Sequence, residues 1–351
     1  MFLRVSLPIA LYCWILKSSI ILSSPFVSYD LKYLYNNSLG SINTSTIQNF
    51  RSSRLTGVLP ATISQINLLI VTVKSLMLFN QNLESLFEYF WIVVPNKDIH
   101  KVHSILMVAT NSKLHPIFRI VGESAVLYEK KHRRYHGWHI QQDIKLAMSR
   151  FVRTAYYIIF DADVFCGRKM AYDDFIDSKT NRAYTISERA KTFYAYTIGN
   201  FNLTGQHLNI PFPDVNDETL MMGFTPIIFS TAVVNNITSY FTARERRPWL
   251  EYFMELHMSN KLFTEYLLYW MWSVNNGVYD LYHINVPSHQ IAWGCEATAE
   301  SLAAYFNLKN RPPLLHSDDN KVNDTANIWM IFKNGMKIGG HSQDSGLLKV
   351  Q

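Results

Sequence analysis

From residue 66 onward, short apolar runs alternate with stretches in which apolar residues recur every three or four positions. Runs of the first kind are typical of strands, and stretches of the second kind are typical of helices. Strands separated by helices indicate a mostly parallel sheet with helices on both faces. The expected strands cover residues 66–73, 91–94 and 118–121, and the expected helices cover residues 76–90, 97–106 and 138–152.

The apolar run at residues 156–160 is followed directly by Asp161, Ala162 and Asp163. A run this apolar predicts a buried strand, so the two carboxylates lie where that strand leaves the core. Side chains at i and i+2 of an extended segment project to the same side, which allows Asp161 and Asp163 to converge on one ligand. Because two like charges this close repel, a divalent cation with positions open for phosphate is the expected ligand. An Asp-rich turn is the simpler alternative.

The helix expected before this strand carries a polar face. Trp138, Gln141, Gln142 and Lys145 occur at i, i+3, i+4 and i+7, and positions with this spacing share one face of a helix. An aromatic ring, two amides and an ammonium together suit a sugar or a phosphate. Periodicity alone favours another arrangement, in which Trp138 packs and the polar side chains face water.

The chain before residue 66 has a different character. Residues 1–27 contain two apolar stretches around Lys17, which predict a cleavable signal peptide or a single-pass signal anchor. Residues 28–65, rich in Ser, Thr and Asn from residue 38, predict a stem or linker. N-glycosylation sequons begin at Asn36, Asn43, Asn202, Asn236 and Asn323. We therefore expect the secretory pathway lumen: a type II Golgi membrane protein, a resident of the endoplasmic reticulum, or a secreted protein if the signal is cleaved.

The amino-acid composition excludes further classes of protein. Apolar residues make up 48% of the 351 residues and aromatic residues 14%, which excludes a disordered chain. The net charge of +6 is spread over the chain, so no nucleic-acid partner is expected. Cys166 and Cys295 either form one disulfide or remain two buried thiols.

The strand with its D-x-D, preceded by the helix with the pattern Gly-Trp-x-x-Gln-Gln-x-x-Lys-Leu, resembles GT-A nucleotide-sugar glycosyltransferases. It is most similar to a GT-A-like family classed as a domain of unknown function. Two more stretches share the likeness, Gly223-Phe224-Thr225-Pro226 and Phe263-Thr264-Glu265-Tyr266-Leu267-Leu268-Tyr269. The resemblance covers about residues 66–293 and implies a GT-A-like, Rossmann-like α/β fold. The expected single catalytic domain covers residues 66–335, followed by a flexible tail at residues 336–351.

The resemblance also implies a function and a site. The implied activity is a metal-dependent glycosyltransferase that moves a sugar from a UDP- or GDP-sugar to a glycan, glycoprotein or glycolipid acceptor. Mn²⁺ or Mg²⁺ is expected to help the diphosphate leave. Glu265 is the expected base for the acceptor hydroxyl, or orients the acceptor if the reaction retains configuration. The expected metal ligands are Asp161, Asp163 and His316, with His316 preferred over His289 and His341, and the expected donor-binding residues are Asp161, Trp138, Gln142 and Lys145.

Two other functions stay open. Haloacid-dehalogenase-like phosphohydrolases also have an apolar strand that ends in D-x-D, with the first aspartate, here Asp161, as nucleophile. That family has the motif on the first strand of its domain, whereas several elements precede it here. A non-catalytic lumenal carbohydrate-binding protein with a transferase-like fold is the second alternative, because fold alone does not determine function.

Overall fold

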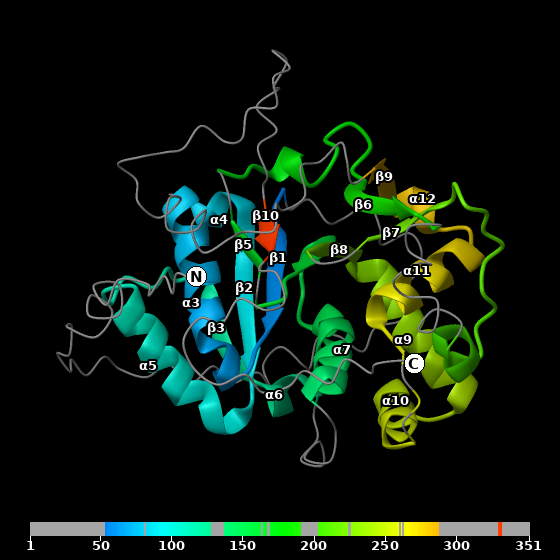
Figure 1. Cartoon of the computed structure of the whole chain (residues 1–351), viewed down its shortest axis with the longest axis horizontal. Helices are drawn as coiled ribbons and strands as arrows, with labels where there is room; N and C mark the ends of the chain where they lie inside the picture. The colour runs from blue at the N-terminus through cyan, green and yellow to red at the C-terminus, as the bar shows by residue number, and fades with distance from the viewer. Residues whose placement is uncertain are drawn as a thin grey trace, which may run out of the picture.

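The computed structural model describes residues 53–287 and 329–331, except residues 81, 128–136, 163, 167–168, 191–202, 224–225, 260 and 262. A five-stranded sheet with the order β3-β2-β1-β4-β8 runs through this part of the chain (Figure 1). The first four strands are parallel, and β8 pairs antiparallel with β4. Its strands are β1 (Leu55–Pro60), β2 (Phe87–Val94), β3 (Phe118–Gly122), β4 (Tyr156–Ile159) and β8 (Ile227–Ser230).

Helices cover both faces of this sheet, as the alternation of patterns predicts (Figure 1). The helices α3 (Ile66–Phe79) and α5 (Ile99–Ala109) pack on one face. The other face carries α7 (Gly137–Ala147), α9 (Thr231–Glu245), α10 (Trp249–Met258) and α11 (Glu265–Asn275). Along β4, Tyr157 and Ile159 point into the second layer and Ile158 points into the first. The expected fold class, a mostly parallel sheet flanked by helices, is therefore confirmed.

Smaller elements complete the described chain. A second sheet has the order β7-β6-β9, and a two-stranded ladder joins β5 to β10. These strands are β5 (Val164–Cys166), β6 (Ala183–Arg189), β7 (Leu220–Met222), β9 (His283–Pro287) and β10 (Trp329–Ile331). The short helices are α4 (Leu83–Leu86), α6 (Glu123–Leu127), α12 (Tyr279–Tyr282), η2 (Ile63–Gln65), η3 (Asn96–Asp98), η5 (Met148–Arg150) and η6 (Tyr172–Asp174).

The expected start of the folded domain at Ile66 is wrong. Strand β1 lies within the stretch expected to be a stem, all six of its residues are buried, and it pairs with both β2 and β4. The expected strand at residues 66–73 is instead the first part of α3, where Leu69, Val73 and Leu76 are buried at helical spacing. The expected helix at residues 76–90 is also wrong from residue 87, because Phe87 begins β2.

The later expectations agree better with the structure. The strand expected at residues 118–121 is β3, and the one expected at 91–94 is the second half of β2. The helix expected at 138–152 corresponds to α7 followed by η5, and the one expected at 97–106 corresponds to η3 and α5. Cys166 is a buried thiol, while Cys295 lies outside the described residues. None of the described helices is long and apolar enough to cross a bilayer, and the expected signal or anchor at residues 1–27 lies outside the described residues.

Gly57 in β1 leaves room for an aromatic ring. A Cβ at this position would overlap the ring of Phe90, which is fully buried against the rings of Phe118 and Phe160. Gly57→Ala is expected to lower the free energy of unfolding by about 1–3 kcal/mol, because overpacking forces a buried ring to shift. Urea denaturation measures the loss.

The matched control is Gly137→Ala, where an added Cβ meets no atom within 4 Å. This exposed substitution is expected to change the free energy of unfolding by less than about 0.5 kcal/mol. Equal effects of the two substitutions contradict the assignment of Gly57 to a packing role.

Candidate functional site

Asp161 lies directly beyond β4, at the carboxyl end of the strand. The backbone N–H of Phe160 still donates to the carbonyl of Val58 at 2.8 Å, so the parallel ladder ends one residue before the carboxylate. The side chain of Asp161 is 35% exposed, whereas Ala162 is buried. Open α/β sheets bind their ligands at the carboxyl ends of their strands. Asp161 therefore has both the position and the access that a ligand-binding carboxylate needs.

Two hydroxyl groups of α3 hold the backbone beyond Asp161. The Oγ1 atom of Thr72 lies 2.6 Å from the carbonyl oxygen of Val164 and 3.1 Å from that of Ala162. Ser75 Oγ accepts a hydrogen bond from the backbone N–H of Cys166 at 2.9 Å. Both hydroxyl groups are buried, and such bonds are costly to leave unmade. The turn that carries Asp161 is thus attached to the helix that follows β1.

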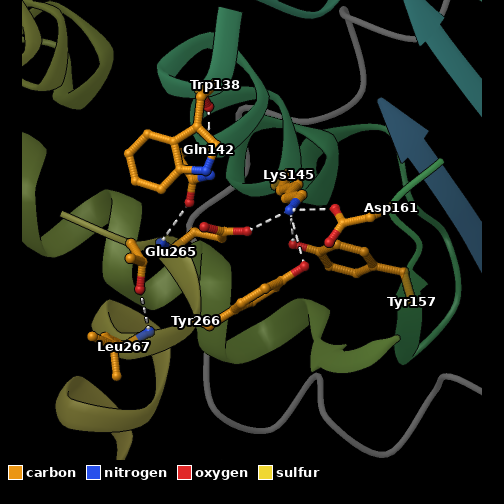
Figure 2. A network of polar contacts seen from close by, with 9 residues as sticks. Trp138, Gln142, Lys145, Tyr157, Asp161, Glu265, Tyr266 and Leu267 are labelled. Atoms are coloured by element: carbon orange, nitrogen blue, oxygen red, sulfur yellow. Dashed lines mark hydrogen bonds and ion pairs between the residues drawn. The ribbon is translucent and has the colours of Figure 1, made fainter. Parts of the chain in front are cut away.

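Lys145 is the centre of the polar contacts near Asp161 (Figure 2). Its Nζ atom lies 2.9 Å from Asp161 Oδ1, 2.8 Å from Glu265 Oε1 and 2.9 Å from the hydroxyl of Tyr266. An ammonium group has three N–H donors, and three acceptors surround this one. Burial alone lowers the pKa of Lys145, but Asp161 and Glu265 attract the charge and hold the pKa well above its usual value. The side chain is 4% exposed, and the expected role of Lys145 in donor binding stays a prediction.

Glu265 occupies the first turn of α11, where Thr264 caps the helix by accepting from the backbone N–H of Leu267. The side chain of Glu265 is 1% exposed, and its backbone N–H donates to Gln142 Oε1 at 3.1 Å. Burial raises the pKa of the Glu265 carboxyl, and the charge of Lys145 opposes this rise. Among the described residues, Glu265 Oε2 has no hydrogen-bond partner. Glu265 is therefore a buried residue of α11 rather than part of a solvated helix face.

Burial of the side chains on the polar face of α7 is the reverse of what periodicity favours. Gln142 and Lys145 are buried, while Trp138 is 39% exposed. Figure 2 shows Trp138 beside Gln142 and away from Asp161, with the amide nitrogen of Gln142 donating to the carbonyl of Trp138 at 3.4 Å. Trp138 is thus placed to meet a ligand only outside the Lys145 contacts, and its expected role in donor binding stays a prediction.

A buried chain of side chains attaches α7 to α10. The Nδ1 atoms of His139 and His257 are 2.9 Å apart, and His257 Nε2 lies 3.2 Å from Asp143 Oδ1. The ring of Phe263 stacks on His257 at 4.8 Å between centroids. Phe263 comes two residues before Glu265 in the chain, so these contacts hold α10 and the segment that leads into α11 against α7.

Two tyrosines complete the site, and neither received a role from the sequence. The ring of Tyr266 lies 4.6 Å from Lys145 Nζ, in addition to the contact through its hydroxyl. Tyr157 donates from its hydroxyl to the carbonyl of Lys145 at 2.9 Å. Burial raises the pKa of both phenols well above the usual value. The position of Tyr266 next to Glu265 in the sequence could have identified it as a site residue. Tyr157 lies in an apolar strand, and its sequence position indicates only a core residue.

Of the three expected metal ligands, only Asp161 is described, because Asp163 and His316 lie outside the described residues. In the part of the chain that the structure covers, no three His, Cys, Asp or Glu side chains are grouped to hold a metal ion. Lys145 already contacts the Asp161 oxygen Oδ1. The described residues therefore do not fit a divalent cation at that oxygen.

Residues 53–305 match the model of a family of unknown function, DUF6492, which confirms the resemblance to such a family. No curated protein sequence matches the chain. Mouse xyloside xylosyltransferase 1, in its apo form, is similar over 72% of this chain and 92% of its own, with 8% identity and a TM-score of 0.41.

Two further solved structures are also similar. The galactosyltransferase LgtC with donor and acceptor sugar analogs covers 80% of this chain and 88% of its own, at 11% identity and a TM-score of 0.41. The apo bifunctional glycosyltransferase WbbM covers 71% of this chain and 40% of its own, at 14% identity and a TM-score of 0.39. All three are glycosyltransferases by their names.

Proposed function

The chain belongs to DUF6492, a family of unknown function, and we propose that it is a glycosyltransferase that takes its sugar from a nucleoside-diphosphate sugar. The observation that carries this proposal is the place of Asp161 at the carboxyl end of β4, partly exposed and oriented by the buried ammonium of Lys145. A carboxylate accepts hydrogen bonds only, and sugars and riboses present many hydroxyl donors. Asp161 is thus suited to hold the hydroxyl groups of a donor.

The remaining residues of the site either position other side chains or are proposed to take part in the reaction. Lys145 holds Asp161 in place and is itself bound by the Tyr266 hydroxyl. Gln142 fixes the start of α11 through the backbone N–H of Glu265. Glu265 is the proposed base, because a raised pKa brings a carboxylate closer to the working pH of a base. Its Oε2 atom is the oxygen that an acceptor hydroxyl must reach, since Oε1 faces Lys145.

The proposed metal ion and acceptor are inferred from the sequence. A divalent cation, Mn²⁺ or Mg²⁺, is proposed with Asp163 and His316 as ligands, and when bound it helps the diphosphate leave. The acceptor is proposed to be a glycan, glycoprotein or glycolipid of the secretory pathway, on the basis of the N-terminal apolar segment and the sequons.

A thermal-shift panel of UDP- and GDP-sugars on the full chain, with and without Mn²⁺, tests the proposal. One nucleotide sugar is expected to raise the melting temperature, since a ligand at 100 times its Kd stabilises the folded state by about 2.7 kcal/mol. Asp161→Asn is expected to abolish the shift. Asp280→Asn, which removes an exposed carboxylate on α12, is the control and is expected to keep it. No shift with any nucleotide sugar contradicts the proposal.

A phosphohydrolase that uses Asp161 as nucleophile is the weaker candidate. Three strands, β1, β2 and β3, precede β4 in the chain, whereas that family has its D-x-D on the first strand. Hydrolysis of p-nitrophenyl phosphate that disappears in Asp161→Asn favours this alternative. Glycan binding that persists in Asp161→Asn, with no turnover in the parent chain, favours a non-catalytic carbohydrate-binding protein.

A further inference from the structure

We propose that the Tyr266 hydroxyl is a specificity-determining group of the site, which together with Asp161 binds one hydroxyl of the ligand. That ligand hydroxyl donates a hydrogen bond to the Asp161 carboxylate and accepts one from Tyr266. The inference rests on the proposed function only in taking a sugar or a nucleoside as the ligand at Asp161. It adds a hydrogen-bond donor beside a carboxylate that can only accept.

The first support is the hydroxyl hydrogen of Tyr266. The hydroxyl oxygen lies 2.9 Å from Lys145 Nζ, and an ammonium can only donate, so the phenol is the acceptor of this bond. Burial and the charge of Asp161 raise the pKa of Tyr266 well above its usual value, so the phenol keeps its hydrogen. Among the described residues, Lys145 is the only hydrogen-bond partner of this hydroxyl. The hydrogen is therefore left for a ligand or a water molecule.

The contacts of Tyr266 both fix this hydroxyl and strengthen it as a donor. The ring lies 4.6 Å from Lys145 Nζ and packs edge-on against the ring of Phe229. A hydroxyl that accepts a hydrogen bond from a cation is polarised, and its own hydrogen becomes a better donor. Polar groups that are this far from full solvation usually have all their partners, and an exception calls for a ligand or an ordered water.

The second support is the distance between Tyr266 and Asp161. Both contact the same ammonium, Asp161 through Oδ1 at 2.9 Å and Tyr266 through its hydroxyl at 2.9 Å (Figure 2). The N–H bonds of an ammonium diverge tetrahedrally, which puts the two acceptor oxygens about 5 Å apart. Hydrogen bonds between oxygen atoms span about 2.5–3.0 Å, so one ligand oxygen can contact both. Asp161 is 35% exposed and Tyr266 is partly exposed, which gives a ligand access to the pair.

The charges around this pair favour a neutral ligand group. One ammonium, that of Lys145, lies beside the two carboxylates of Asp161 and Glu265. An ionised phosphate oxygen is repelled by carboxylates and has no hydrogen to donate to Asp161. An amide N–H donates to Asp161 but cannot accept from Tyr266. A hydroxyl does both, and sugars and riboses are the ligands that present it.

Calorimetric titration of wild type and Tyr266→Phe with intact and deoxygenated nucleotide sugars tests the inference. The probes are UDP-glucose, UDP-galactose and GDP-mannose, with their 2′-deoxyribose, 3′-deoxyribose and deoxy-sugar analogues. Tyr266→Phe is expected to weaken binding of an intact nucleotide sugar by about threefold to tenfold, as for one neutral hydrogen bond. The analogue that lacks the bridging hydroxyl is expected to bind both chains equally. Its identity, a ribose or a sugar analogue, gives the source of the hydroxyl.

The analogues separate a ligand contact from a merely structural role of Tyr266. Loss of the Lys145 contact alone weakens every analogue by the same factor, so equal losses across the whole set overturn the inference. An unchanged Kd in Tyr266→Phe also overturns it. Tyr240→Phe is the matched control and is expected to leave every Kd unchanged, because this exposed tyrosine of α9 contacts Arg244 and not Lys145.

A crystal structure of the unliganded chain supplies a test that needs no nucleotide sugar. An ordered water is expected within hydrogen-bond distance of both the Tyr266 hydroxyl and Asp161, because water can donate to one and accept from the other. Absence of such a water overturns the inference, and this result decides alone if Tyr266→Phe does not fold. Failure of every nucleotide sugar to bind removes the proposed function and leaves the pair to be judged by the water. Binding that is equal in wild type and Tyr266→Phe keeps the function and removes the inference.

Discussion

Lys145→Met is expected to lower the free energy of unfolding by about 3–5 kcal/mol, because removing one partner of a buried ion pair leaves the other uncompensated. The side chain of Glu265 is 1% exposed and faces Lys145 at 2.8 Å. Asp161 contributes less to the loss, because its side chain is 35% exposed and water replaces part of the interaction. Chemical denaturation of the purified variants, monitored by circular dichroism, measures the change.

A second substitution separates charge from packing. Lys145→Met/Glu265→Gln removes the buried negative charge together with the cation, so it is expected to recover a large part of the lost stability. Lys101→Met removes an exposed charge and is expected to stay within about 0.5 kcal/mol of wild type. A double variant no more stable than Lys145→Met contradicts the view that uncompensated charge causes the loss.

Acidification from pH 7 to pH 4.5 is expected to cost about 3 kcal/mol of stability through His283 alone. Burial lowers the pKa of this imidazole to about 3, from a usual value of 6.5. The ring is 1% exposed, with Nδ1 2.7 Å from Thr185 Oγ1 and Nε2 2.7 Å from the hydroxyl of Tyr269. The folded state therefore keeps His283 neutral in the range where the unfolded chain takes up a proton.

The sign follows from linkage between protonation and folding. Between the unfolded pKa and the folded pKa only the unfolded state binds the proton, so stability is lost as pH falls below 6.5 and continues to fall toward about 3. Each pH unit in this window costs about 1.4 kcal/mol. The measurement is the free energy of unfolding at the two pH values for wild type and His283→Gln.

The variant with glutamine at position 283 cannot titrate there and is expected to lose about 3 kcal/mol less than wild type over this pH interval. His100→Gln, a substitution of an exposed histidine on α5, is the control and is expected to follow the wild-type curve. Parallel curves for wild type and His283→Gln contradict the assignment.

Much of the sheet could be predicted because strands buried on both faces read as continuous apolar runs. The run at residues 156–160 contains β4, and all four residues of that strand are buried. Strand β1 was missed because Gly57 and Pro60 suggest a loop. Only the ring of Phe90, which comes from the next strand, explains why a glycine is needed there. Helix α3 was missed because its many β-branched residues favour a strand.

The sequence identified several residues of the candidate site, but it did not predict how they are arranged. The spacing of Gln142 and Lys145 correctly placed both on one face of a helix. It could not show that this face is buried, because a lysine on a helix is normally solvated. What draws Lys145 inside is contact with Asp161 and Glu265, and Glu265 lies far away in the sequence on a separate helix. Such contacts depend on tertiary packing and have no signature in local periodicity.

The two hydroxyl groups of Thr72 and Ser75 have a thermodynamic consequence for any ligand of Asp161. They attach the segment beyond this residue to α3, which itself follows the central strand β1. Association with a flexible loop consumes part of the binding free energy in ordering the loop. Here the backbone at Ala162, Val164 and Cys166 is already held when the chain folds. A ligand that reaches Asp161 therefore keeps the free energy that a mobile loop would have consumed.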